Sequence, residues 1–185
     1  MVWTIEAKML PLVGISGHLY IDIFDDNGAR VCQINGLATN PLNLKPRDIG
    51  LPGDLLKAYL GTLVLGGTEN ATRDHHPHKG RVLFRGDKKD IIKAIEAAIK
   101  AADYINQLDV PYRVLTINSN SVFTHIVKAI STVVDLDQQA LKEAYGLKKF
   151  LPGVNGKITD EFRRAAGKNA PQNPPKNPPP PPPKP

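Results

Sequence analysis

The sequence has little cysteine, few aromatic residues and no long hydrophobic run. Its single cysteine, Cys32, excludes an internal disulfide and a cysteine-rich metal site. No segment approaches the roughly 20 apolar residues of a membrane-spanning helix, so we expect no membrane span. The first residues include an acid and lack a basic start followed by an apolar stretch, so we expect no cleavable signal peptide. We therefore expect a cytoplasmic protein as synthesised, with export by a specialised secretion system as an open alternative.

Recognisable sites for small cofactors are missing as well. The stretch 61–68 lacks the Gly-Lys-Ser/Thr ending of a phosphate-binding loop, which argues against a nucleotide cofactor. His75, His76 and His78 lie close together, but Pro77 interrupts regular geometry, and no matched carboxylate or cysteine spacing accompanies them. We therefore predict no metal site and no other cofactor.

The net charge of +6 does not define a basic surface. Three of the lysines that create it, Lys168, Lys176 and Lys184, lie in a terminal segment without acids. The other basic residues are scattered among acids, as in 87–90 (Asp-Lys-Lys-Asp), and no aromatic side chains are interleaved with them. We predict that the chain does not bind nucleic acid.

The composition divides the chain into a globular domain, 1–167, and a disordered proline-rich tail, 168–185. Ten of the residues from Pro171 to Pro185 are proline, and such a segment favours the extended polyproline II conformation. The tail is either a spacer, which we favour, or a ligand for a protein partner with an aromatic-lined groove.

The periodicity of the domain predicts a mixed α+β fold, with an antiparallel sheet packed against helices. The helix expected over 88–108 presents one apolar stripe, formed by Ile91, Ile95, Ala98, Ala102 and Ile105. Other helices are expected over 54–60, 121–134, 138–145 and 159–166. Strands are expected from about residue 2 to 7 and over 17–24, 29–35, 61–67, 81–85 and 112–117.

The Asn27-Gly28 pair between two strand-like runs predicts a hairpin with a two-residue loop. The loop implies these cross-strand pairs: Phe24 with Val31, Asp22 with Gln33, Tyr20 with Asn35, and His18 with Leu37. Because strand residues alternate between faces, one face carries the polar residues and the other carries Leu19, Ile21, Ile23, Cys32 and Ile34. The polar face brings a carboxamide diagonal to His18, as a catalytic base requires, unless this face is simply solvated.

A second junction, 116–123, connects an apolar run to an amphipathic helix through four small polar residues, Asn118-Ser119-Asn120-Ser121. Free N–H groups and the helix dipole favour negative charge at a helix start, which is where nucleophiles are often placed. Serine and asparagine are also preferred helix caps, so capping alone is the competing interpretation.

These features resemble a circularly permuted papain-like domain, as in permuted NlpC-type peptidases and lecithin–retinol acyltransferase-like enzymes. The resemblance covers about residues 14–135. It rests on Gly17-His18-Leu19-Tyr20-Ile21-Asp22, on the Asp26-Asn27-Gly28 turn and on Asn118-Ser119-Asn120-Ser121. In that family the histidine comes first, on a strand, and the nucleophile follows at a helix start, commonly as Asn-Cys. The chain is also similar to toxin-like and phage-associated bacterial domains with an Asn-Ser-Asn-Ser motif.

The resemblance implies a hydrolase that cuts an amide bond, in a peptide or peptidoglycan, or an acyl ester, as a bacterial effector or toxin-like domain would. Ser119 would be the nucleophile in place of the family's cysteine, His18 the general base, and Asn35 or Gln33 the residue that orients the imidazole. A serine hydroxyl stays protonated and depends on its base more than a thiol does. The alternative is a catalytically inactive binding module of a secretion or phage assembly.

Overall fold

The computed structural model of the chain describes residues 2–12, 17–47, 50–61, 68–114 and 118–147. In chain order the elements are β1 (Trp3–Pro11), β2 (Gly17–Phe24), β3 (Arg30–Thr39), β4 (Pro46–Arg47), β5 (Leu55–Gly61), β6 (Lys79–Gly86), α1 (Lys88–Gln107), α2 (Ser119–Ile130) and α3 (Gln138–Tyr145). The predicted domain end at residue 167, the helix expected over 159–166, most of the strand expected over 61–67 and the tail at 168–185 lie outside the described residues.

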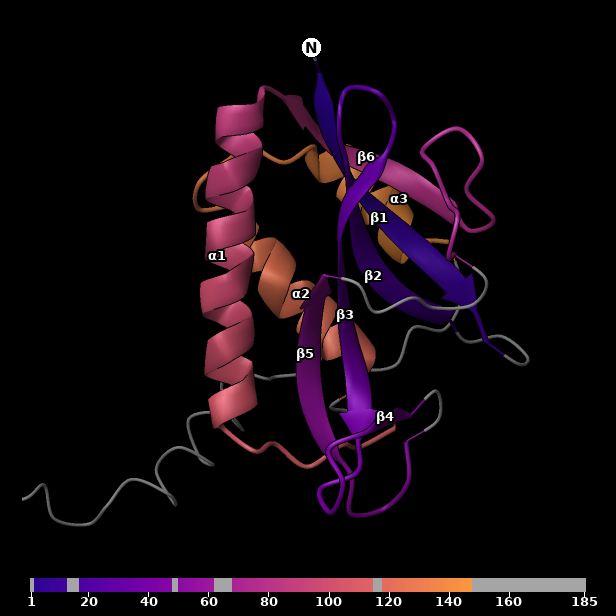
Figure 1. The fold of residues 1–185 in the computed structure, drawn as a ribbon, viewed down its shortest axis with the longest axis vertical. Coiled ribbons are helices and arrows are strands. Elements are labelled where there is room, and N and C mark those ends of the chain that lie inside the picture. The colour runs from indigo at the N-terminus through magenta and orange to yellow at the C-terminus, as the bar shows by residue number, and fades with distance from the viewer. Residues whose placement is uncertain (1, 13–16, 48–49, 62–67, 115–117, 148–185) are drawn as a thin grey trace, which may run out of the picture.

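The strands form one antiparallel sheet (Figure 1). Hydrogen-bonded neighbours follow the order β4-β3-β2-β1-β6, and β5 also pairs with β3. Ala38 and Thr39 of β3 pair with both β4 and β5, so these two strands lie on opposite sides of β3. The predicted α+β class with an antiparallel sheet is therefore confirmed.

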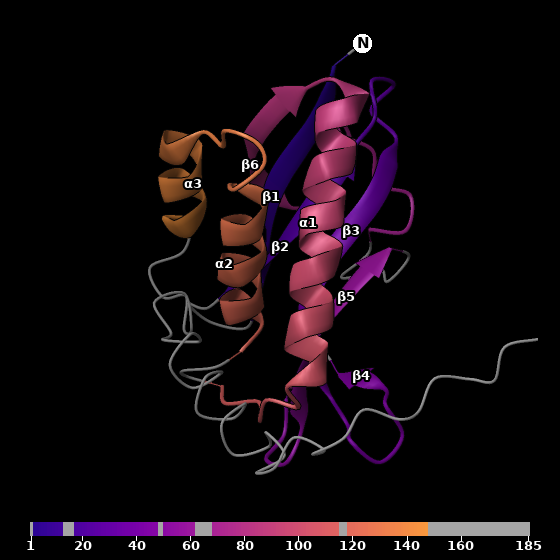
Figure 2. The same ribbon diagram turned by 90° about the vertical axis from the view of Figure 1, so that its left-hand side faces the viewer.

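All three helices cover the same face of this sheet (Figure 2). α1 packs against α2 and β5, α2 against β2 and β3, and α3 against β6 and β1. The apolar side of the β2–β3 hairpin faces them, and its residues enter the core as predicted: Leu19, Ile21, Ile23, Cys32 and Ile34. Among the described helices, none is long and apolar enough to cross a membrane.

The stripe of α1 is confirmed except at one position. Asp87 caps the helix by accepting the N–H of Asp90 at 2.9 Å. The buried residues are Ile91, Ala94, Ala98, Ala101, Ala102 and Ile105. Ile95 is only partly buried and packs against the core, while Ala94 and Ala101, which were not part of the predicted stripe, are buried.

The opposite face of the sheet carries polar side chains that are buried along β1 and β2, and the segment 68–78 contacts it. The Glu6 carboxylate accepts from Lys8 Nζ at 2.8 Å and from Arg73 Nε, in that segment, at 3.0 Å. The interpretation of this face as solvated is wrong along β2, where three polar residues are at most 5 % exposed: His18, Tyr20 and Asp22. Buried polar groups at this density need hydrogen-bond partners.

The turn between β2 and β3 differs from the predicted two-residue loop. The N–H of Asp25 donates to the O of Ala29 at 2.9 Å, which leaves a three-residue loop. Gly28 has φ of 78°, a left-handed conformation that such loops require and that glycine adopts without strain. Phe24 therefore pairs with Arg30 instead of Val31, and a bulge at Val31 of β3 restores the predicted register in the pairs beyond it. The predicted pair of Asp22 with Gln33 is confirmed.

β2 and β3 separate beyond the pair formed by Ile21 and Ile34. Two predicted pairs are therefore wrong: Tyr20 with Asn35, and His18 with Leu37. From Asn35 onward, β3 pairs only with β5 and the short β4. The separation opens one edge of β2 at the position of the predicted catalytic histidine.

Residues 55–61 form a strand where the sequence favoured a helix. Leucine, alanine and lysine are good helix formers, which is why the local pattern was misleading. In the fold, Leu56 and Ala58 point into the core, and β5 forms seven pairs with β3. Tertiary pairing thus overrides local propensity in this segment.

Two further boundaries differ from the prediction. Residues 112–114, expected to begin a strand, form no strand; the adjacent Pro111 makes an isolated bridge with Leu55. The second helix begins two residues earlier than expected and ends at Ile130 instead of Val134, because the following residues form successive turns. The helix predicted over 138–145 is confirmed.

Candidate active site

Helix α2 begins at Ser119 and is capped by the preceding residue, Asn118. Asn118 Oδ1 accepts the N–H of Asn120 at 3.0 Å, while the N–H of Asn118 donates to Ser121 Oγ at 3.2 Å. This reciprocal capping box defines the helix start. The cap is therefore Asn118 and not Ser119, whose side chain is left for another role.

The side chain of Asn120 joins the start of α2 to β2. Its Oδ1 accepts the N–H of Leu19 at 2.8 Å, and its Nδ2 donates to the O of Gly17 at 3.1 Å. These backbone groups lie on the edge of β2 from which β3 has separated. Because Gly17 and Leu19 flank His18, the Asn120 side chain holds its neighbour Ser119 beside the segment that carries the histidine.

Gly36 of β3 allows α2 to approach this closely. A Cβ atom at position 36 would lie 2.5 Å from Val122 Cβ and 2.9 Å from the Ser119 carbonyl oxygen. Both distances are below normal contact, so a larger residue would push the helix start away from the sheet. The absence of a side chain at this position thus contributes to the placement of Ser119.

His18 and Asn35 meet as the sequence predicted. His18 Nε2 lies 3.4 Å from Asn35 Oδ1, and both residues are buried. Burial lowers the pKa of His18 to about 4, against an opposing effect of the Asn35 hydrogen bond and a smaller lowering by His78. The imidazole is therefore neutral at pH 7, and if Nε2 carries its hydrogen, Nδ1 carries the lone pair.

Ser119 is 9 % exposed, and its side chain is hydrogen-bonded to Tyr112, a residue that the sequence did not single out. Burial raises the pKa of Tyr112, so its phenol keeps its proton. Among the described residues, no hydrogen bond joins Ser119 to His18 or Asn35, and none involves the N–H of Ser119. The structure thus joins His18 to Asn35 and brings the start of α2 to the backbone of β2, and in the residues that it describes it shows no contact of the Ser119 side chain with His18 or Asn35.

A buried network extends from Asn35 and contains functional candidates that the sequence did not identify. Asn35 Nδ2 donates to Gln33 Oε1 at 2.9 Å, and Gln33 Nε2 donates to Asp22 Oδ1 at 3.0 Å. The other carboxylate oxygen of Asp22 lies 2.7 Å from His76 Nε2. Gln33, the alternative candidate to orient His18, is thus hydrogen-bonded to Asn35 and Asp22.

The far end of the network lies in the histidine-rich segment. His76 Nδ1 accepts the N–H of His78 at 3.1 Å, and His78 Nδ1 lies 2.7 Å from the hydroxyl of Tyr20. The ring of Tyr20 in turn stacks on His18 at 6.0 Å between centroids. These histidines bind the polar face of the sheet, a role that their spacing along the chain does not predict.

Two other candidates have structural partners. Cys32 is buried in the core, as predicted, and burial raises the pKa of its thiol, which makes it unreactive. His125 of α2 stacks on Tyr104 of α1 with ring centroids 6.2 Å apart.

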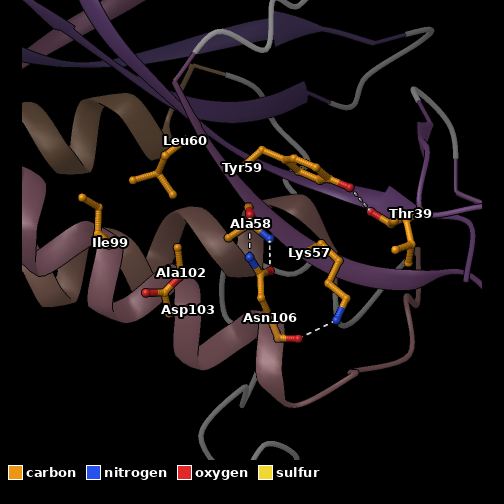
Figure 3. A pocket seen from close by; sticks show the side chains of 10 residues that line it. Thr39, Lys57, Ala58, Tyr59, Leu60, Ile99, Ala102, Asp103 and Asn106 are labelled. Atoms are coloured by element: carbon orange, nitrogen blue, oxygen red, sulfur yellow. Dashed lines mark hydrogen bonds between the residues drawn. The ribbon is translucent and has the colours of Figure 1, made fainter.

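A groove of about 540 Å³ lies elsewhere, between β5 and α1 (Figure 3). Apolar atoms of Leu60 and Ile99 line it, and Asn106 of α1 bonds to the backbone of Ala58 through both ends of its amide, at 2.7 and 2.9 Å. None of the three predicted catalytic residues lines this groove.

Comparisons with protein-family models, with curated proteins and with solved structures found no match to this chain.

Proposed function

We propose that the chain is a permuted papain-like hydrolase of amide or acyl-ester bonds, in which Ser119 is the nucleophile, His18 the base and Asn35 the residue that orients the base. The observation that carries this proposal is the pair of hydrogen bonds from Asn120 to Gly17 and Leu19. They attach the residue after the serine to both neighbours of the histidine, across a gap of more than 100 residues in sequence.

The reaction begins with the Ser119 hydroxyl, which leaves Tyr112 and attacks the carbonyl carbon of the substrate. Its proton passes to Nδ1 of His18, and the electron pair of the carbonyl π bond moves to the oxygen, which becomes the oxyanion of a tetrahedral intermediate. Collapse of the intermediate expels the amine or alcohol, which takes the proton from His18. Water then attacks the acyl-serine by the same route and releases the acid.

The oxyanion has a donor at the helix start. The N–H of Ser119 lies in the first turn of α2, where unpaired amides and the helix dipole favour negative charge. Asn118 takes up the next two amides, those of Asn120 and Ser121, through its side chain and its carbonyl oxygen. Of these three amides, the N–H of Ser119 is therefore the donor to the oxyanion.

One observation favours the second candidate function, a catalytically inactive binding module. The side chain of Ser119 is engaged by Tyr112, and the low pKa of His18 makes it a weak base. A module of this kind would retain the buried polar network for stability and would not turn over a substrate.

Labelling with a fluorophosphonate, which reacts with activated serines, tests the proposal. We expect one adduct per folded chain, located on Ser119 by peptide mass spectrometry, and no adduct after Ser119→Ala or His18→Gln. Ser131→Ala, at the exposed C-cap of the same helix, is the matched control and should label like the wild type. A folded wild-type protein that takes up no probe would favour the binding module.

The variant Ser119→Cys provides an independent measurement. Next to a base and a helix N-terminus, the introduced thiol should have a lowered pKa and react with iodoacetamide faster than an exposed cysteine. This excess should disappear in the His18→Gln background. A pH–rate profile that matches the exposed control and does not depend on His18 would contradict the catalytic pair.

A further inference from the structure

In the hydrogen-bond network that joins Asn35 to Gln33 and Asp22, each amide donates to the next residue, and the last acceptor is the Asp22 carboxylate. Asp22 is fully buried, and each of its oxygens faces a nitrogen, Gln33 Nε2 at 3.0 Å and His76 Nε2 at 2.7 Å. A carboxylate oxygen accepts hydrogen bonds, so the nitrogens of Gln33 and His76 are the donors at these two contacts. This requirement orients the Gln33 amide with its oxygen toward Asn35.

The orientation passes from one amide to the next. Gln33 Oε1 accepts from Asn35 Nδ2 at 2.9 Å, which turns Asn35 Oδ1 toward His18 Nε2 at 3.4 Å. A carbonyl oxygen also only accepts, so His18 Nε2 must carry the hydrogen. The reverse arrangement would bring Gln33 Oε1 against the Asp22 carboxylate, with no hydrogen between two acceptors.

His76 fixes the other end of the network. Its Nδ1 accepts the backbone N–H of His78 at 3.1 Å, and a backbone N–H cannot reverse its role. His76 Nδ1 is therefore unprotonated, and its hydrogen lies on Nε2, facing Asp22.

We propose that Asp22 and Gln33 are positioning residues which, through Asn35, hold His18 in the tautomer with its lone pair on Nδ1, the atom that takes the serine proton. The catalytic meaning of this tautomer rests on the proposed function. The tautomer itself is a property of the resting protein and can be measured without substrate.

The variant Asp22→Asn should reverse the network. The hydrogen of His76 Nε2 requires an oxygen opposite it, so the new amide must present its oxygen to His76 and its nitrogen to Gln33. Gln33 and Asn35 then turn over, and His18 must accept at Nε2 and carry its hydrogen on Nδ1. The double variant Asp22→Asn/Gln33→Glu moves the carboxylate one link along and restores the original direction.

Long-range ¹H–¹⁵N correlation NMR at neutral pH reads the tautomer, with the His18 signals assigned by their loss in His18→Gln. In the wild type, we expect the His18 tautomer with its hydrogen on Nε2 to be at least about tenfold more populated than the tautomer with its hydrogen on Nδ1. The Nδ1 tautomer should predominate in Asp22→Asn, and the Nε2 tautomer again in the double variant. Fluorophosphonate labelling should be lost in the single variant and return in the double one. A side chain that acted only in packing would leave the tautomer unchanged in every folded variant.

Two results would overturn the proposal: hydrogen on Nδ1 in the wild type, or an unchanged tautomer in folded Asp22→Asn. If the latter variant does not fold, Gln33→Met breaks the same link with a side chain of similar shape. The two tautomers should then approach equal populations, and an unchanged ratio would also overturn the proposal. The NMR measurement does not depend on a reaction. If the tautomers are as expected but the fluorophosphonate does not label the protein, the hydrolase proposal is refuted and the proposed positioning network is not.

Discussion

Removal of the Asn120 side chain should destabilise the protein far more than removal of a side chain that makes the same kind of contact nearer to solvent. Asn120 satisfies two buried backbone groups of β2, the N–H of Leu19 and the O of Gly17. Each buried group left without a partner costs about 1–3 kcal/mol. Asn120→Ala should therefore lower the free energy of unfolding by about 2–6 kcal/mol.

Asn106 provides the matched control. Its amide bonds to the N–H and O of Ala58 on the outer edge of β5, with the same bidentate geometry, but the side chain is only partly buried. Water can replace the lost partners at this edge, so Asn106→Ala should cost about 1–2 kcal/mol. Urea denaturation followed by circular dichroism measures both variants. Equal losses, or a loss below 1 kcal/mol for Asn120→Ala, would refute the argument that this amide closes the edge of β2.

A second substitution at Asn120 separates hydrogen bonding from volume. Asn120→Asp keeps the shape of the side chain and can still accept from Leu19, but it faces the carbonyl oxygen of Gly17 with an acceptor. We expect it to be at least as destabilising as Asn120→Ala at pH 7, because it costs free energy either to bury the charge or to protonate the carboxylate at this pH. Near-wild-type stability would show that the hydrogen bond to Gly17 does not contribute to the free energy of unfolding.

The remaining predictions concern pH, close packing and the core. His18 has a pKa of about 4 when folded and 6.5 when unfolded, so only the unfolded chain takes up the proton between these values. Stability is therefore complete above pH 6.5 and should fall by about 3 kcal/mol as the pH drops to 4, a slope that His18→Gln should reduce in urea titrations. Gly36→Ala should cost about 1–3 kcal/mol and abolish probe labelling of the serine, because the new methyl meets Val122. Ile91→Ala should cost about 2–5 kcal/mol, and Ile95→Ala clearly less, since only Ile91 is fully buried; equal losses by thermal denaturation would contradict this.

The sequence predicts those parts of the fold that depend on neighbours along the chain. Alternation in the β2–β3 hairpin places His18 and Asn35 on one face, and apolar spacing identifies α1 and α3. Local propensity fails at β5, because pairing with β3 and packing under α1 override the helical preference of its residues. The loop length is also wrong, and the register is right only because a bulge offsets the extra residue.

The candidate site could be predicted only in part, for a similar reason. His18 and Ser119 stand out through their local surroundings, on a strand and at a helix start. The hairpin pattern predicts the pair of Asp22 with Gln33, which is confirmed, but it does not predict the hydrogen bonds of this pair to Asn35 and His76. The contacts of Asn120 span 101 and 103 residues, and that of His76 with Asp22 spans 54. No local pattern in one sequence encodes contacts of this range.

The separation of β2 from β3 has a consequence for the order in which the molecule folds. The edge of β2 at Gly17 and Leu19 is closed by a residue from α2, which follows them by about 100 positions in the chain. Closing so long a loop is slow compared with forming a hairpin, so the β2–β3 turn can form while this edge is still open. Until α2 docks, the edge offers unpaired backbone groups to any other strand, including that of a second copy. The Asn120 amide, once it has closed this edge, thus also shields the sheet from pairing between molecules.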